Sequence, residues 1–208
     1  MLKSRLKGLD IALNDNQDYN FSRYMELFLE KNSKLNLISK NDEKFLFEKH
    51  IYDSLSLNLF LKNKKFETLL DIGTGGGFPS LPLAILYDDL QITAIDSIRK
   101  KINVVSEISQ ELNLKNLTLI CDRVENIDKK YDIVVSRAVA SLEKILDLAI
   151  PKVKCGGYFI AYKSKKYTEE LLNAKKIISK YKLKNPQIIE YKLPLDEIYE
   201  RYLVIFKV

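Results

Sequence analysis

The residues with the clearest chemical meaning are glycines that closely follow an aspartate. Asp71 ends a short apolar run, and glycine occupies four of the positions 73–77. Glycine lets a backbone adopt positive φ angles and approach a ligand without a Cβ in the way. A tight turn needs one or two such residues, so this density predicts a loop that binds a ligand.

The spacing of these glycines does not match the dinucleotide pattern G-x-G-x-x-G. Counted from Gly73 the third glycine position holds Phe78, and counted from Gly75 it holds Ser80. The carboxylate of Asp71 would repel a pyrophosphate but attract the sulfonium and ammonium groups of S-adenosylmethionine. We therefore expect S-adenosyl-L-methionine as the cofactor, bound by Asp71 and the loop glycines. Because Ser80 is small, an NAD-dependent oxidoreductase stays open as an alternative.

A second acid, Asp96, ends the next apolar run. An acid about 20 residues beyond a glycine loop is placed to bind ribose hydroxyls. NAD-binding and S-adenosylmethionine-binding folds share this feature, so it supports a nucleoside without choosing between them. Asp96 could instead cap a helix that begins near Ile98.

Candidate binding residues also lie at the ends of the third and fourth apolar runs. Val124 and Glu125 follow the third run, where an apolar side chain and a polar group suit the face and edge of an adenine. Arg137 ends the fourth run, beside the position of the transferred methyl in such folds. It is expected to pair with a carboxylate of the cofactor or a phosphate of the substrate. A structural ion pair with Asp71 or Glu125 is the alternative.

The elements that must position these residues alternate between short apolar runs and helical patterns. This alternation predicts βαβ units and a buried, mostly parallel sheet. The last two runs have no helix between them and so predict an antiparallel pair. The expected strands are 67–72, 91–96, 117–121, 132–136, 158–162, 187–191 and 203–206, and the expected helices between the early ones are 81–86, 100–112 and 142–151.

The first 64 residues show helical spacing instead. Phe21, Tyr24, Met25 and Phe28 form an amphipathic stripe, and a second helix is expected from about 42 to 60. We therefore predict a Rossmann-like class I S-adenosylmethionine-dependent methyltransferase fold with a C-terminal antiparallel hairpin. Residues 1–64 would be a helical extension packed on the domain at 65–208, and the two would form one structural unit.

The charge and composition of the chain limit the kinds of partner that it is expected to bind. Of the net charge of +6, the segment 151–190 contributes +7 from ten Lys and three Glu, which leaves −1 for the rest. This distribution favours a polyanion such as RNA, although a Lys-rich composition alone can produce it. One His and two Cys, Cys121 and Cys155, do not make a zinc site or a disulfide framework. With no apolar run of about 20 residues and no secretory signal, we expect a cytoplasmic protein without membrane contact or metal.

The chain closely resembles the glucose-inhibited division protein B family, the methyltransferases that modify N7 of a guanine in 16S ribosomal RNA. The specific matches are Gly-Thr-Gly-Gly-Gly-Phe-Pro at 73–79 and Ser-Arg-Ala-Val-Ala-Ser-Leu at 136–142. Supporting segments occur in the family's order across nearly the whole chain. They are 34–39, 50–55, 95–97 with Lys100 and Lys101, 123–125, 156–157 and 162–163.

The resemblance implies the reaction, the partner and the site residues. It implies 16S ribosomal RNA or the small ribosomal subunit as the partner, and we separately expect the enzyme to be a monomer. It also implies cofactor contacts at Gly73, Phe78, Asp96, Val124, Glu125 and Arg137, and an RNA side lined by Lys49, His50, Lys163 and Arg201. Lys49 replaces the family's usual arginine and cannot form its bidentate phosphate contact.

No catalytic residue is certain, and His50 and Arg137 are candidates. Guanine N7 has a free lone pair, so the transfer needs positioning rather than a general base. A lone His on a helix face is also commonly a packed structural residue. A methyltransferase with another acceptor and an RNA-binding module with a vestigial cofactor pocket remain alternatives.

Overall fold

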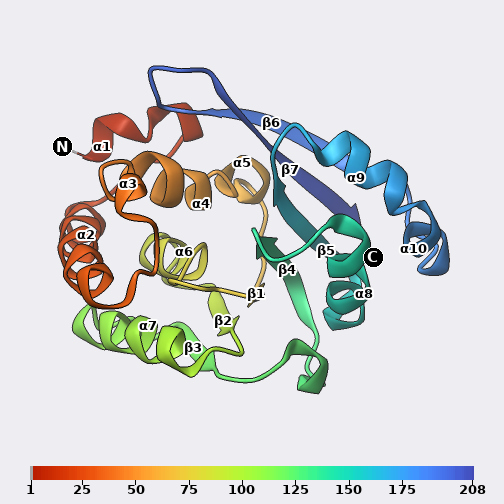
Figure 1. The fold of residues 1–208 in the computed structure, drawn as a ribbon, viewed down its shortest axis with the longest axis horizontal. Coiled ribbons are helices and arrows are strands. Elements are labelled where there is room, and N and C mark those ends of the chain that lie inside the picture. The colour runs from red at the N-terminus through yellow and green to blue at the C-terminus, as the bar shows by residue number, and fades with distance from the viewer. Residues whose placement is uncertain (1) are drawn as a thin grey trace.

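A seven-stranded sheet runs through the centre of the computed structural model, which describes residues 2–208 (Figure 1). The strand order is β3-β2-β1-β4-β5-β7-β6. Strands β1 to β5 are parallel, and β7 is antiparallel to both β5 and β6. The strands are β1 (Thr68–Ile72), β2 (Gln91–Ile95), β3 (Leu117–Ile120), β4 (Tyr131–Arg137), β5 (Val153–Lys163), β6 (Gln187–Leu193) and β7 (Tyr199–Lys207). This confirms the predicted Rossmann-like fold with its C-terminal antiparallel hairpin.

Helices cover both faces of the sheet. Consecutive strand residues point to opposite faces, so Leu69 and Leu70, both fully buried, belong to different core clusters. The first cluster packs α2 (Asp15–Leu35), α6 (Ser80–Leu86) and α7 (Arg99–Glu111) on one face. The second packs α8 (Leu142–Ala149), α9 (Tyr167–Asn173) and α10 (Lys175–Lys180) on the other. Burial on both faces explains why the parallel strands read as continuous apolar runs.

The N-terminal helices pack on the first face through the predicted stripe of α2. Its residues Phe21, Tyr24 and Phe28 are all at most 1% exposed. A capping box between Asn14 and Gln17 begins this helix. The division of the chain between residues 64 and 65 stays a prediction.

The expected single helix at 42–60 is wrong. The segment contains α3 (Lys40–Glu43), a π-helical stretch η2 (Leu46–Tyr52), α4 (Asp53–Leu55) and α5 (Asn58–Leu61). Apolar steps of four predict a helix but not where it is interrupted, and residues 51–58 are all buried, so no exposed face marks the π-helical stretch. The side chain of Ser39 caps α3.

Two other elements differ from expectation. Strand β5 begins at Val153, five residues early, because the glycine pair at 156–157 lies within the strand at an irregular pairing with β4. Helices α9 and α10 were not predicted, because they bury few side chains and show a weak apolar stripe. The remaining short helices are α1 (Leu2–Arg5), η1 (Lys7–Leu9), η3 (Val124–Asn126) and η4 (Ile150–Lys152).

Candidate active site

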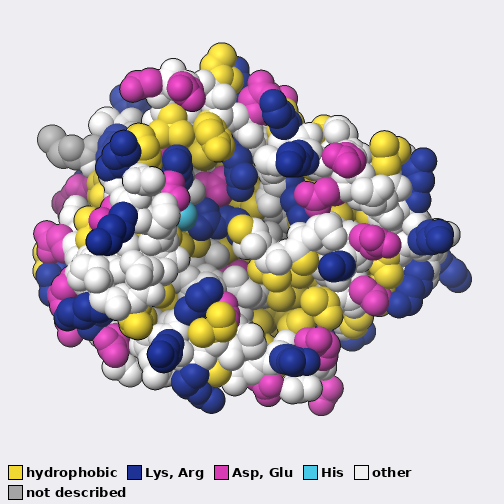
Figure 2. All heavy atoms as spheres, viewed as in Figure 1, with side chains coloured by type: hydrophobic (Ala, Val, Ile, Leu, Met, Phe, Trp, Pro, Cys, Tyr) yellow, Lys and Arg dark blue, Asp and Glu magenta, His cyan; other side chains and the backbone are white. Residues whose placement is uncertain are grey.

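A cavity of about 510 Å³ opens where the parallel strands end at their carboxyl edge. The face in Figure 2 is hollowed near its centre. A volume between about 300 and 1,000 Å³ is typical of a site for a small molecule or cofactor, and this edge is where such folds bind ligands. The predicted cofactor residues that line it are Gly73, Gly75, Phe78, Asp96, Val124, Glu125 and Arg137, and His50 lines it as well.

The glycine loop forms one wall because its backbone needs glycine. Gly73 has a φ of 72° and Gly75 a φ of 57°, in the left-handed region. A Cβ on Gly73 would lie 2.4 Å from Cγ2 of Val139. The amides of Gly73 and Thr74 both donate to the carbonyl of Ile95, at 2.8 and 3.0 Å, and so hold the loop against the end of β2.

Asp96 connects the loop to the following helix. Its Oδ2 accepts from the amide of Gly75 and its Oδ1 from the amide of Ile98, both at 2.9 Å. Helix α7 begins at Arg99 with Ile98 as its N-cap, and no side chain caps it, so the alternative role of Asp96 as the helix cap is wrong. A carboxylate has about four acceptor positions, so the two hydrogen bonds of Asp96 leave room for ribose hydroxyls.

The opposite wall suits a flat aromatic ring. Val124 is buried in η3 with its neighbour Glu125 exposed. Sequence analysis did not predict that the apolar residues Ile38, Val139 and Leu148 line the cavity. They come from a loop, a turn and a helix that have no shared spacing, so only the folded chain brings them together.

Asp71 does not line the cavity. The alternation of β1 places its fully buried side chain under the loop, on the face covered by α6. Neither carboxylate oxygen has a well-aligned hydrogen bond among residues 2–208. Burial raises the pKa of Asp71 to about 7, and the nearby Thr74, Arg137 and Ser80 offset only part of that effect. Its predicted contact with the cofactor stays a prediction.

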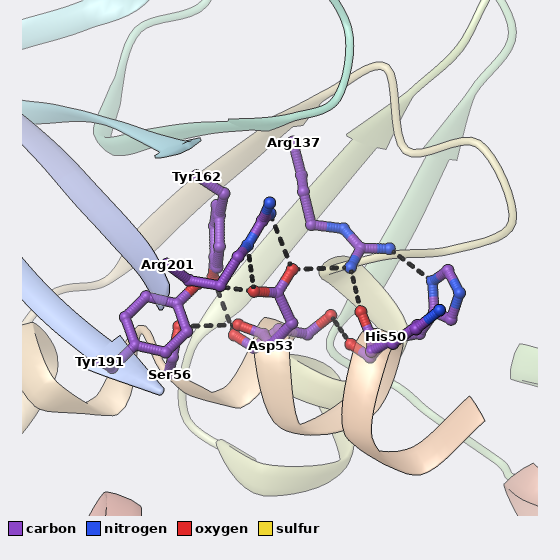
Figure 3. Close-up of polar contacts among 9 residues, drawn as sticks. His50, Asp53, Ser56, Arg137, Tyr162, Tyr191 and Arg201 are labelled. Atoms are coloured by element: carbon purple, nitrogen blue, oxygen red, sulfur yellow. Dashed lines mark hydrogen bonds and ion pairs between the residues drawn. The ribbon is translucent and has the colours of Figure 1, made fainter. Parts of the chain in front are cut away.

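Arg137 is held at the cavity by three partners, which Figure 3 shows. Its Nη1 donates to Oδ2 of Asp53 at 2.9 Å and to the carbonyl of Lys49 at 3.1 Å. Its Nη2 lies 3.0 Å from Nδ1 of His50. The guanidinium also lies 5.1 Å from the centre of the Phe78 ring, within the range of a cation–π contact.

The alternative ion pair of Arg137 with Asp71 or Glu125 is therefore wrong, because its partner is Asp53. Sequence analysis missed this aspartate. The available signal was an acid three residues after His50 within an otherwise apolar helical stretch. A charge on the buried face of a helix requires a counter-charge, and only the fold shows which one it meets.

The other predicted RNA-side cations already have partners in the chain, and none of them lines the cavity. Lys49 pairs with Asp42, and Lys163 with Glu170, both at 2.7 Å. Arg201 forms two hydrogen bonds with Asp53, at 3.1 and 3.3 Å. Of the four predicted residues, only His50 reaches the cavity.

His50 is neutral near pH 7. Burial, followed by the charge of Arg137, lowers its pKa to about 4. Because arginine can only donate, Nδ1 must accept and the proton lies on Nε2. Nε2 is buried without a partner among the described residues.

Within residues 2–208, His, Cys, Asp and Glu form no group of three or more that could hold a metal ion. Cys121 and Cys155 are both free thiols. No helix in the same range is long and apolar enough to cross a bilayer.

The sheet with its antiparallel seventh strand, and the glycine-loop cavity at its carboxyl edge, define the class of S-adenosylmethionine-dependent methyltransferases. Within this class, the profile of the GidB family, rRNA small subunit methyltransferase G, matches residues 17–199. The chain belongs to this family, as the two specific motifs predicted.

Curated relatives extend the match over nearly the whole chain. A ribosomal RNA small subunit methyltransferase G from Lachnoclostridium phytofermentans is 41% identical, covering 97% of this chain and 86% of its own. One from Lysinibacillus sphaericus is 37% identical, covering 97% and 87%. A SAM-dependent methyltransferase structure from Aquifex aeolicus supports the fold, with a TM-score of 0.59 and 20% identity over 81% of this chain and 95% of its own. These findings favour a methyltransferase over the NAD-dependent alternative.

Proposed function

We propose that this protein transfers a methyl group from S-adenosylmethionine to N7 of a guanine in 16S ribosomal RNA. The observation that carries the proposal is the cavity built from the glycine loop, Asp96 and Val124 at the carboxyl edge of the sheet. The relatives named rRNA small subunit methyltransferase G support the choice of RNA. The guanine and its N7 rest on the family resemblance.

Each part of the cavity wall has a proposed role toward the cofactor. Asp96 would accept hydrogen bonds from the ribose hydroxyls, and Val124 and Glu125 would contact the adenine. Gly73, Gly75 and Phe78 would line the amino-acid end, where Arg137 offers a positive charge. The fit is good because the wall is apolar where an adenine face would lie and charged where ionised groups would lie.

The proposed methyl transfer requires few catalytic roles from the side chains. Bound S-adenosylmethionine supplies a methyl group that is already activated by the sulfonium. Guanine N7 has a free lone pair, so the residues must hold the base in line and tolerate the cationic product. The neutral state of His50 agrees with this role, because it adds no further positive charge beside the reacting base.

A lysine-rich surface could hold the RNA outside the cavity. Figure 2 shows blue Lys and Arg side chains gathered over α9 and α10, on the same face as the hollow. The exposed lysines that we call the α10 lysines are Lys175 and Lys176 in α10 and Lys182 and Lys184 just after it. They lie in the basic segment 151–190, and a phosphate backbone is the partner that such a surface fits.

We further propose that the protein acts as a monomer in the cytoplasm. Ribosomal RNA is found in the cytoplasm of bacteria, which is where the relatives' named substrate would be.

The test is methyl transfer from labelled S-adenosylmethionine to small-subunit ribosomal RNA that lacks its own methyl groups. Naked RNA and assembled particles are assayed separately, and the digested nucleosides are identified by mass. We expect 7-methylguanosine from at least one of the two. Cofactor binding without transfer to either would assign the protein to another acceptor, and the absence of cofactor binding would refute the proposal.

A further inference from the structure

The carboxylate of Asp53 joins three separate parts of the chain behind the cavity wall (Figure 3). Its Oδ2 accepts from Arg137 on β4 and from Arg201 on β7. Its Oδ1 accepts from Nε of Arg201 and, at 2.6 Å, from the hydroxyl of Tyr191 on β6. The side chain of Asp53 is only 2% exposed, so these four contacts replace its hydration.

Arg137 keeps donors that the chain does not use. An arginine has five N–H groups. Its two Nη1 hydrogens go to Asp53 and the carbonyl of Lys49, and one Nη2 hydrogen goes to His50. The hydrogen bonds of Arg137 within residues 2–208 involve neither Nε nor the second Nη2 hydrogen, and the side chain lines the cavity.

The charges around this arginine do not cancel. Asp53 contributes −1, and Arg137 and Arg201 contribute +1 each, while His50 is neutral, which leaves a net +1. Asp71 also lies in the field of Arg137, but burial raises its pKa to about 7, so it neutralises only part of this charge. An excess positive charge in a half-buried wall favours an anionic group in the cavity.

We propose that Asp53 is a positioning residue, which holds Arg137 so that its unused N–H groups receive the carboxylate at the amino-acid end of the cofactor. The inference rests on the proposed function, which assigns the cavity to S-adenosylmethionine. Arginine binds carboxylates through a rigid fork of donors, so its orientation decides whether both hydrogen bonds can form.

The shared carboxylate is what makes this orientation rigid. Arg201 and Tyr191 fix Asp53 from the C-terminal hairpin, and His50 fixes the far edge of the Arg137 guanidinium. A side chain that is already immobile loses less entropy when a ligand binds. The hairpin, remote from the glycine loop in sequence, thereby contributes to cofactor binding.

The experiment compares two ligands by isothermal titration calorimetry: S-adenosylmethionine and decarboxylated S-adenosylmethionine, which keeps the sulfonium and the amine. In Asp53→Asn we expect about tenfold weaker binding of S-adenosylmethionine, the size of one charge-assisted hydrogen bond. Binding of the decarboxylated ligand should stay within about twofold of wild type, since such a change is only about 0.4 kcal/mol.

A double-mutant cycle identifies the route of the effect. Arg137→Gln should weaken S-adenosylmethionine by itself, and Asp53→Asn should add little in the Arg137→Gln background. Fully additive losses would overturn the inference, as would an equal weakening of both ligands in Asp53→Asn.

Asp132→Asn is the matched control. Asp132 lies at the opposite end of β4, where it pairs with Lys154 and accepts from the amide and hydroxyl of Thr68. The Asp132→Asn variant should have a lower melting temperature and unchanged affinities for both ligands.

If Asp53→Asn does not fold, Tyr191→Phe keeps every charge and removes one donor to Asp53. It should weaken S-adenosylmethionine selectively but less, and an unchanged affinity would overturn the inference. Failure of the wild type to bind either ligand would instead refute the proposed function.

Discussion

His50 has a protonation state that its neighbours decide. Arg137 occupies its Nδ1, Lys49 adds a second positive charge, and the carboxylates of Asp42 and Asp53 oppose them. Burial and Arg137 prevail, so the imidazole stays neutral well below its usual pKa. Sequence analysis could identify this histidine as a candidate, but its charge depends on neighbours that the fold supplies.

Acid should therefore destabilise the protein through His50. Its pKa is about 6.5 in the unfolded chain and about 4 in the folded one, so the unfolded state binds the proton first. Stability falls as the pH drops from 6.5 towards 4, by about 1–2 kcal/mol between pH 7 and pH 5. Urea denaturation at the two pH values measures it.

His50→Asn supplies the reference, because its amide oxygen can still accept from Arg137 and does not titrate. The raised pKa of Asp71 acts in the opposite direction, since a folded state that binds protons more readily gains stability as the pH falls. Asp71 is present in both proteins, so the difference between their slopes isolates His50. Equal slopes would show that His50 is not neutral in the folded state.

Asp96 is the second residue whose chemistry can be tested directly. Asp96→Ala should weaken S-adenosylmethionine binding by about 1.5–3 kcal/mol, because hydrogen bonds from the ribose and the Gly75 amide to a charged acceptor are lost. Calorimetric titration measures the change. Asp128→Ala, which removes an exposed acid outside the cavity, should bind as wild type. An unchanged affinity in Asp96→Ala would exclude Asp96 from the ribose site.

At the scale of elements, the glycine loop is the part whose backbone is most constrained. Gly73 and Gly156 both have positive φ, 72° and 80°. A Cβ would meet Val139 at Gly73, but at Gly156 nothing lies within 4 Å. The two positions therefore separate backbone strain from steric conflict.

Gly73→Ala should abolish measurable cofactor binding, because the loop must move to admit the Cβ. Gly156→Ala should cost only the strain of a left-handed residue, about 1–2 kcal/mol of stability, and leave affinity intact. Thermal melts and calorimetric titrations of both variants are the measurements. Wild-type affinity in Gly73→Ala would contradict the assigned role of the loop.

The pattern of apolar residues predicted some elements accurately and others not. The apolar strands β1, β2 and β4 were found within one residue of their observed ends, because burial on both faces produces an unmistakable apolar run. The elements within 42–60 were not, because residues 51–58 are all buried and show no exposed face that would mark the π turn of η2. That turn lies between Phe45 and Asp53, in the segment that supplies three of the partners of Arg137.

At the scale of the whole molecule, the uneven charge predicts how RNA binds. Replacing all four α10 lysines with glutamine should weaken RNA binding and reduce the slope of log K against log[salt] by up to about 3, at roughly 0.7–0.9 per phosphate contact. Filter binding to small-subunit ribosomal RNA at several salt concentrations measures both. Cofactor affinity should not change.

The matched control removes four exposed lysines from outside the basic segment 151–190. Lys65, Lys115, Lys129 and Lys130 lie just before strands β1, β3 and β4. Their replacement changes net charge equally but should change the salt slope little. Equal effects of the two sets would mean that RNA responds to total charge and not to this surface.

The sequence by itself determined the sheet, the glycine loop, the cofactor class and the family. These depend on local signals, such as apolar runs, glycines needed for positive φ, and motifs that stay adjacent along the chain. Seven of the eight predicted cofactor residues line the cavity for this reason.

Only the tertiary structure decided how the charges pair. Arg137 and Arg201 lie 84 and 148 residues from Asp53 along the chain, yet both donate hydrogen bonds to its carboxylate. The same contacts occupy Arg201, whose expected place on the RNA side stays a prediction. Ion pairs of this kind form between side chains that burial brings together, and buried charges must find partners wherever the fold places them. No local pattern in the sequence records that choice.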